Sequence, residues 1–246
     1  MKRPIIATNE IYHIYNRGVE KRKIFLDDED RFRFIHDLFE FNDINPTLNL
    51  TYYFKSQFKE VGLPKIEREP RKLLVEILVF CLMPNHFHLM VKQKIDGGIT
   101  LFMRKLGTGY VNYFNQKYKR VGPLFQGKYK MVHLCQDAHF LYLPYYIHLN
   151  PLELVIPEWK EKDTKDIKKV MRFLEQYRWS SFPDYIDHKN FPSVTQRNFL
   201  LKLFDGPENY RKDTIKWIGD TNIDGDEDKE LILELTNLRK SDFLKF

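Results

Sequence analysis

Two histidines, His86 and His88, stand two positions apart in the segment MPNHFHLMV, with a phenylalanine between them. Successive side chains of a β-strand point to opposite faces, so both imidazoles are expected on one face and Phe87 in the core on the other. Two imidazoles held this close can bind one divalent metal ion. Paired histidines on a strand can also be solvent-facing polar residues, and the spacing alone leaves both interpretations open.

A second group of candidate residues lies in the segment DAHFLYLPYYIHLNP. Tyr146 and Asn150 are four residues apart and therefore share one face of a helix. Pro151 disfavours helical geometry at the residue before it, which places Asn150 in the last turn of that helix. A tyrosine hydroxyl beside a metal site indicates nucleophilic catalysis, but its pKa of about 10 requires a base or a metal-activated target. The other interpretation is that Tyr142, Tyr145 and Tyr146 are half-buried packing residues.

The type of metal follows from ligand chemistry. Mg²⁺ prefers oxygen ligands, so a site with two histidines favours Mn²⁺ unless water and phosphate oxygens complete the coordination. Zn²⁺ is less favoured because no third His or Cys stands at an obvious ligand spacing. His148 lies two positions after Tyr146 and points elsewhere on a helix, so we expect it to support the site or to face DNA.

The segment KYKRVGPLFQGKYK, residues 117–130, has five basic and three aromatic residues and no acidic residue. Basic side chains follow phosphates, and aromatic rings stack on unpaired bases. The segment therefore predicts a surface for single-stranded DNA, which Arg17 is expected to extend. A solvated charged loop with core aromatic residues is the alternative. The candidate DNA-binding residues are Arg17, Lys117, Tyr118, Lys119, Arg120, Lys128, Tyr129 and Lys130.

The chain must supply strands and helices that hold these residues. Residues 10–18 alternate as a strand does, with His13 and Tyr15 on one face together with Ile11. The acidic start and apolar spacing of the next segment predict a helix that begins near Asp27 or Asp28. The expected apolar face of this helix consists of Phe32, Ile35, Leu38 and Phe39.

The two histidines are expected on the second strand of a hairpin that turns at Pro84 and Asn85, after a first strand around residues 73–82. The order strand, helix, strand, strand, helix, strand is that of the ferredoxin-like split βαβ fold. We therefore predict an α+β protein with an antiparallel sheet, helices on one face of it and a C-terminal helical extension. The later elements expected are a helix over 99–119, a strand over 128–135, and a helix over 137–150 that Pro144 interrupts.

The composition also suggests how the chain is divided. Residues 1–155 are expected to form the main domain, which holds all the candidate site residues. A polar segment with three prolines near 43–72 reads as an insertion in that domain. Residues 156–246 are more charged and have helical patterns, and we expect them to form the extension packed on the domain.

Bulk properties limit the classes of partner and compartment. The chain has 246 residues, of which 43% are hydrophobic, enough for a substantial core. A net charge of +6 and a pI of about 9.0 favour a polyanionic partner. Two cysteines, Cys81 and Cys135, are too few for a disulfide framework, which favours the reducing cytoplasm. No run of roughly 18 apolar residues and no signal peptide is found, so we expect a cytoplasmic protein without a membrane partner.

Five blocks of sequence stand in order between roughly residues 10 and 185: YHIYNRG, FCLMPNHFHLMV, LFMRKLGTGYVNYFNQKYKRVGPLFQGKYK, YYIHLNP and YRWSSFPDY. Together they resemble the IS200-like transposases, in particular the REP-associated tyrosine transposases, which are single-tyrosine HUH nucleases. HUH denotes two histidines separated by a hydrophobic residue, and His86-Phe87-His88 matches it.

The resemblance implies a set of roles. His86 and His88 would bind Mg²⁺ or Mn²⁺, with Asn150 as a third ligand where related enzymes carry Gln. Tyr146 would attack a phosphate of single-stranded or hairpin DNA and leave a 5′-phosphotyrosine and a free 3′-OH. Tyr145 is the competing nucleophile. Relatives act as monomers or homodimers, and both states are open for this chain.

Two other functions compete with a DNA transposase. The first is a domesticated DNA-binding protein that recognises the structure of repeat elements without cleaving them. The second is a metal-dependent hydrolase that cleaves RNA or DNA phosphodiesters with activated water. The presence of both histidines, the tyrosine and the amide argues against a protein that only binds DNA, because binding alone does not require them.

Overall fold

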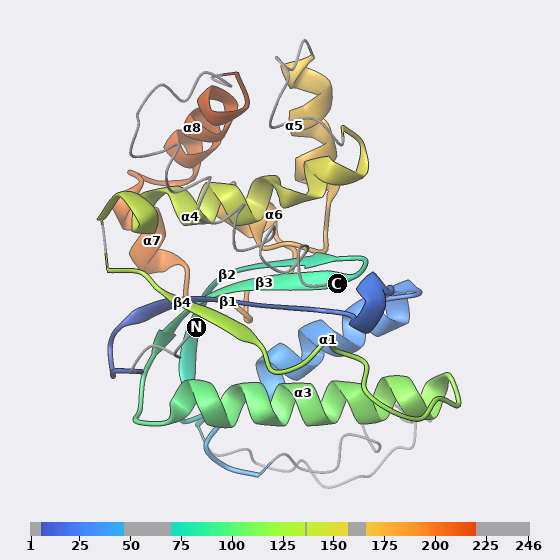
Figure 1. Ribbon diagram of the computed structural model, residues 1–246. Helices are drawn as coiled ribbons and strands as arrows, with labels where there is room; N and C mark the ends of the chain where they lie inside the picture. The colour runs from blue at the N-terminus through green and yellow to red at the C-terminus, as the bar shows by residue number, and fades with distance from the viewer. Residues whose placement is uncertain (1–5, 47–69, 136, 157–165, 220–246) are drawn as a thin grey trace, which may run out of the picture.

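The computed structural model describes residues 6–46, 70–135, 137–156 and 166–219. In these residues a four-stranded antiparallel sheet lies between two layers of helices (Figure 1). The strand order is β2-β3-β1-β4, the order of the ferredoxin-like split βαβ fold, so the predicted α+β class is confirmed. The elements of this domain are β1 (Ile11–Arg17), α1 (Asp28–Glu40), β2 (Val75–Met83), β3 (His86–Gln93), α3 (Gly98–Lys117) and β4 (Lys130–His133).

Local sequence signals account for the start of α1 and for the hairpin. Asp27 is the N-cap of α1, and its side chain accepts a hydrogen bond from the backbone of Asp30, whose own side chain accepts one from the backbone of Asp27. β2 and β3 form a hairpin that turns at Pro84 and Asn85, as predicted. This turn brings the histidines to the start of β3.

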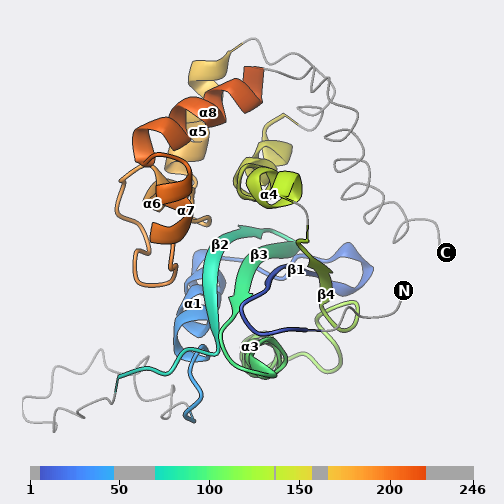
Figure 2. The same ribbon diagram turned by 90° about the vertical axis from the view of Figure 1, so that its left-hand side faces the viewer.

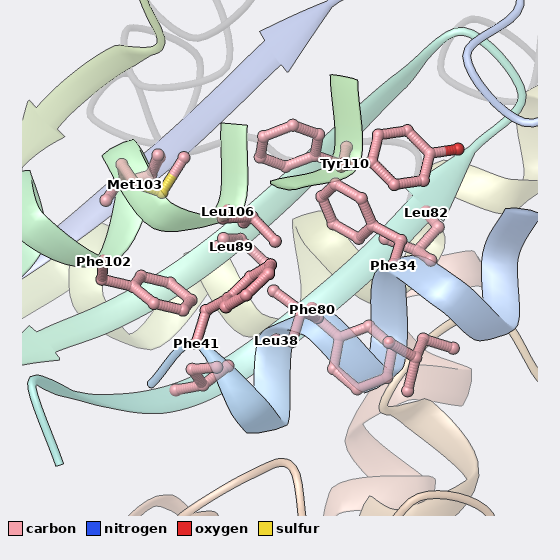
Figure 3. Packing of buried hydrophobic residues seen from close by; sticks show 14 of the residues in the cluster. Phe34, Leu38, Phe41, Phe80, Leu82, Leu89, Phe102, Met103, Leu106 and Tyr110 are labelled. Atoms are coloured by element: carbon pink, nitrogen blue, oxygen red, sulfur yellow. The ribbon is translucent and has the colours of Figure 1, made fainter. Parts of the chain in front are cut away.

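Helices α1 and α3 cover one face of the sheet and enclose the first core (Figure 3). Phe34, Phe80 and Tyr110 are among its largest fully buried side chains. Phe32, predicted to lie in this core, is 40% exposed and instead contacts Trp179 and Phe191. The buried face of α1 is therefore rotated from the predicted one and is centred on Phe34, Ile35 and Leu38.

Helix α4 (Asp137–Leu149) lies over the opposite face of the sheet, so the expectation of helices on one face holds for α1 and α3 but not for α4. It runs through Pro144 as one helix, so the predicted interruption does not occur. Figure 2 shows α4 end-on above the sheet, with the C-terminal helices beside it. These later elements are η2 (Asn150–Leu154), α5 (Ile167–Gln176), α6 (Phe182–Tyr185), α7 (Asn198–Leu203) and α8 (Pro207–Gly219).

The C-terminal segment also covers the outer edge of β2. The backbone N–H of Leu82 donates to Trp179 O at 2.8 Å, and the N–H of Ser181 donates to Phe80 O at 3.0 Å. An exposed edge strand would present unpaired backbone groups, so these bonds protect the sheet. The described part of the extension is therefore joined to the sheet by backbone pairing. The division at residues 155 and 156 stays a prediction.

Two further expectations concern the insertion and a membrane-spanning helix. The insertion near 43–72 lies mostly outside them, at 47–69. Within the described ranges, none of the helices has the length and apolar character needed to cross a membrane.

Candidate active site

The two histidines of β3 share the face of the sheet that α4 covers. Their ring centroids are 5.0 Å apart, with the rings edge-on to each other. Phe87, between them, is 1% exposed and packs on the opposite face of the sheet. Its ring centroid lies 5.0 Å from that of Phe34. The alternation along β3 is thus the one that the sequence predicts, and it presents two imidazoles together.

β1 adds residues to this face. Its pairing with β3 sets Tyr15 opposite His88 and Arg17 opposite His86. The Nε2 atom of His13 lies 2.9 Å from Nδ1 of His88, and the two rings stack at 5.1 Å. Sequence reasoning placed His13 on the right face of its strand but gave it no role. The missing information was the register between β1 and β3, which brings the two histidines together across the strands.

Both β3 histidines form a hydrogen bond through Nδ1, which makes Nε2 the candidate ligand atom of each ring. Nδ1 of His86 lies 2.7 Å from Oδ1 of Asn85. A carbonyl oxygen only accepts, so this nitrogen donates and the lone pair of His86 is on Nε2. His88 likewise uses Nδ1 for its bond to His13. In a metal-binding histidine, one ring nitrogen usually donates a hydrogen bond and the other binds the metal.

The protein therefore fits a divalent cation held by two imidazoles and completed by oxygen ligands. In the described part of the chain, no three His, Cys, Asp or Glu side chains are grouped as a ligand set. Further ligands would come from an amide, water or a phosphate. This donor set suits Mn²⁺, or Mg²⁺ that keeps several oxygen ligands, better than a structural Zn²⁺.

Helix α4 separates its two adjacent tyrosines. The ring of Tyr146 lies edge-on to His88 at 5.9 Å and to His13 at 6.3 Å. Tyr145 instead stacks on Tyr210, among the C-terminal helices, with the ring centroids 4.7 Å apart. Burial raises the pKa of Tyr145. Only Tyr146 of this pair therefore has its ring beside the histidines.

Asn150 closes the helix that carries Tyr146. It is fully buried at the start of η2, and its Nδ2 donates a 2.7 Å hydrogen bond to Tyr146 O. The last carbonyl groups of a helix have no partner within it, and this bond satisfies one of them. Asn150 thus ties its own position to that of Tyr146, while its role as a metal ligand stays a prediction.

His148 does not face DNA. It is fully buried, with Nδ1 2.7 Å from the hydroxyl of Tyr210 and Nε2 2.8 Å from Oγ of Ser181. Burial lowers the pKa of His148 to about 3, so the ring is neutral at physiological pH. Its role is to join α4 to α8 and to the segment that covers β2. The expectation of a DNA-facing side chain is wrong because His148 is buried and its hydrogen-bond partners, Tyr210 and Ser181, belong to the C-terminal extension.

The residues expected to contact DNA fall into two groups. Lys117 Nζ lies 2.9 Å from carboxylate oxygens of Asp27, Glu29 and Asp30. Burial works to lower the pKa of Lys117, but these hydrogen bonds outweigh it and raise the pKa above its usual value. The hydroxyl of Tyr118 donates to Asp30 at 2.8 Å, and burial together with this bond raises its pKa to about 12. Both residues hold α3 to α1, so we remove them from the expected DNA surface.

The other candidates lie closer to the histidine face or are exposed. Arg17 is paired with His86, and Lys130 of β4 is paired with Tyr15. Lys119 and Lys128 are exposed. The remaining two candidates have local contacts: Arg120 donates to Oδ1 of Asn115 at 3.1 Å, and Tyr129 is half-buried against the first core.

Residues 51–150 match the family model described as "Transposase IS200 like", and this range includes His86, His88, Tyr146 and Asn150. A solved structure titled as a REP-associated tyrosine transposase bound to a REP hairpin has 10% sequence identity and a TM-score of 0.45. The alignment covers 79% of this chain and 89% of that chain. A search of curated proteins gave no match.

Proposed function

From the match of residues 51–150 to the IS200-like transposases, which agrees with the motifs of the sequence, we propose that this protein cleaves and rejoins single-stranded DNA. The activity serves DNA transposition or recombination, with hairpin-forming DNA as the substrate. The observation that carries the proposal is the position of Tyr146, whose ring lies edge-on to His88 on the face that also holds His86. This arrangement supports a role for Tyr146 as the nucleophile beside two imidazoles that would bind a metal ion.

Tyr146 acts as the nucleophile in this proposal. Its Oη forms a bond to the phosphorus of the scissile phosphodiester, and the bond from phosphorus to the 3′-oxygen breaks. The phenolic proton is lost and the departing 3′-oxygen gains a proton, so the products are a 5′-phosphotyrosine and a free 3′-OH. The reverse attack, by a 3′-OH on the phosphotyrosine, rejoins DNA and restores the tyrosine. No external energy source is needed because the phosphoester bond is conserved.

The residues that would hold a divalent ion are His86 and His88, through Nε2, with Asn150 as the third candidate. A bound Mg²⁺ or Mn²⁺ supplies positive charge that neutralises the developing charge on the phosphate and orients it for in-line attack. Asn85 keeps the ring of His86 oriented, through the 2.7 Å hydrogen bond to its Nδ1.

Access of DNA to the tyrosine requires a movement. Tyr146 is 2% exposed, so a phosphate reaches its hydroxyl only after the groups that cover this side chain move. Arg17 and Lys130 flank the histidine face from β1 and β4. Together with the exposed Lys119 and Lys128, they would guide the DNA backbone toward Tyr146.

The test uses a hairpin oligonucleotide with a single-stranded flank, labelled in turn at its 5′ and 3′ ends, and incubated with the protein and Mn²⁺. A denaturing gel should show the 3′ part of the strand attached to protein and the 5′ part released with a free 3′-OH. Released strands without any covalent adduct would indicate a hydrolase. Binding in a native gel without cleavage would indicate a DNA-binding protein.

A further inference from the structure

We propose that His13 is a positioning residue that fixes His88 in the tautomer able to bind a divalent metal ion. The inference rests on the proposed function and deepens it, because it assigns a role to a residue outside the His-hydrophobic-His motif. The observation is the 2.9 Å hydrogen bond between Nε2 of His13 and Nδ1 of His88, two residues separated by 75 positions in the chain.

The direction of this bond decides whether His88 can act as a ligand. A neutral imidazole has one N–H and one nitrogen lone pair. If His13 donates, Nδ1 of His88 accepts and Nε2 of His88 carries the proton, so Nε2 has no lone pair for a metal. If His88 donates from Nδ1, its Nε2 has the lone pair and His13 accepts. Binding of a metal at Nε2 therefore requires His13 to be the acceptor.

The surroundings of His13 make it a rigid acceptor. The side chain is 2% exposed, and the ring stacks on His88 with an interplanar angle of 15°. Tyr15, on the same strand and the same face, contacts both rings, at 5.1 Å from His13 and 5.9 Å from His88. The two β3 histidines thus have equivalent supports: Asn85 holds Nδ1 of His86, and His13 holds Nδ1 of His88.

A direct metal ligand role for His13 fits the geometry less well. Its Nε2 atom is engaged with Nδ1 of His88, so this nitrogen of His13 does not bind a metal ion while the hydrogen bond holds. Within the ranges that the structure describes, no ligand set of three His, Cys, Asp or Glu side chains is formed. His13 therefore acts on the metal through His88.

The test measures Mn²⁺ binding to the full chain by titration followed with electron paramagnetic resonance. His13→Phe keeps a ring and removes the acceptor, whereas His13→Gln keeps an acceptor oxygen. His133→Gln is the matched control, because His133 is a histidine on neighbouring β4 that bonds to Glu10 at 2.8 Å. Circular dichroism without metal checks that each variant is folded.

We expect His13→Phe to weaken Mn²⁺ binding by about 10-fold to 100-fold, the usual effect of losing a partner of a metal-bound histidine. His13→Gln should recover most of this loss, and His133→Gln should bind as the original protein does. The number of imidazole nitrogens coupled to Mn²⁺ in pulsed spectra should be two, both in the original chain and in His13→Phe.

Three results would overturn the inference. Unchanged affinity in His13→Phe, with binding still abolished by His86→Ala, would remove the role of His13 and leave the proposed function intact. Three coupled imidazoles in the original chain would make His13 a ligand, and this measurement needs no variant to fold. Absence of any Mn²⁺ binding that depends on His86 would reject both this inference and the metal-assisted part of the proposed function.

Discussion

The rings of His88 and Tyr146 lie edge-on with their centroids 5.9 Å apart, and they join strand β3 to helix α4. The two residues are 58 positions apart in the sequence (146 − 88) and belong to different motifs. Their meeting depends on α4 lying on the face of the sheet opposite to α1 and α3 (Figure 1). The C-terminal extension helps to hold α4 there through His148, which bonds to Tyr210 and Ser181.

Substitution of Phe87 tests the facing of β3. Phe87 is buried against Phe34 and Phe125, so Phe87→Ala should reduce the free energy of unfolding by about 3 to 5 kcal/mol. Urea unfolding measures the change. His86→Ala is the control, because His86 is only half-buried and should cost much less stability. A larger loss in His86→Ala than in Phe87→Ala would mean that the faces of β3 are reversed.

Removal of the metal should stop cleavage without preventing folding. A chelator added to the original protein should abolish cleavage of the labelled hairpin, and so should the substitution His86→Ala. Without the metal ion, the developing charge on the phosphate is not neutralised and the phosphate is not oriented for attack. Re-addition of Mn²⁺ should restore activity to the chelated protein but not to His86→Ala. Full cleavage in excess chelator would contradict a metal-assisted reaction.

His148 should make stability depend on pH. Its pKa is about 3 in the folded protein and 6.5 when unfolded, so the folded state binds fewer protons between these values. The stability that neutral His148 provides is complete above pH 6.5 and is lost as pH falls toward 3. The contribution to the slope of unfolding free energy against pH is about 1.4 kcal/mol per pH unit.

The variant His148→Gln isolates this contribution from that of the carboxylates. It should be less stable than the original protein at pH 7, by about 1 to 3 kcal/mol, because the bonds to Tyr210 and Ser181 are disturbed. Its stability should fall less steeply below pH 6.5. Parallel curves for the two proteins would show that His148 takes up its proton at the same pH in the folded and the unfolded state.

Lys128 and Lys117 form a matched pair for the DNA surface. Lys128 is exposed, whereas Lys117 is held by Asp27, Glu29 and Asp30. Lys128→Ala should flatten the slope of log affinity against log salt by roughly 0.7 to 0.9, the value for one phosphate contact. Lys117→Ala should leave that slope unchanged and cost roughly 1 kcal/mol of stability. The opposite pattern would place the DNA path along α3.

Features set by neighbouring residues could be predicted from the sequence. The alternation at His86-Phe87-His88, the turn at Pro84 and the cap at Asp27 depend on contacts within a few positions, and each is present in the structure. The strand order followed from the order of the elements, since the split βαβ arrangement is the usual solution for that order.

Features set by distant contacts could not be predicted. Lys117 stands in a segment without acidic residues, but its carboxylate partners come from α1, up to 90 positions away. The role of His13 depends on the register between β1 and β3, and that of His148 depends on Tyr210 and on the segment after α5. Periodicity reports the face on which a residue lies and gives no information on which element covers that face.

The most direct test of the account compares Tyr146→Phe with Tyr145→Phe in the covalent-adduct assay. Each substitution removes one hydroxyl and leaves the ring, so packing and charge change little. We predict that Tyr146→Phe forms no protein–DNA adduct and no cleaved strand while binding the hairpin with nearly unchanged affinity, and that Tyr145→Phe still forms the adduct. An adduct with Tyr146→Phe, or its loss only in Tyr145→Phe, would contradict the central claim that Tyr146 is the nucleophile.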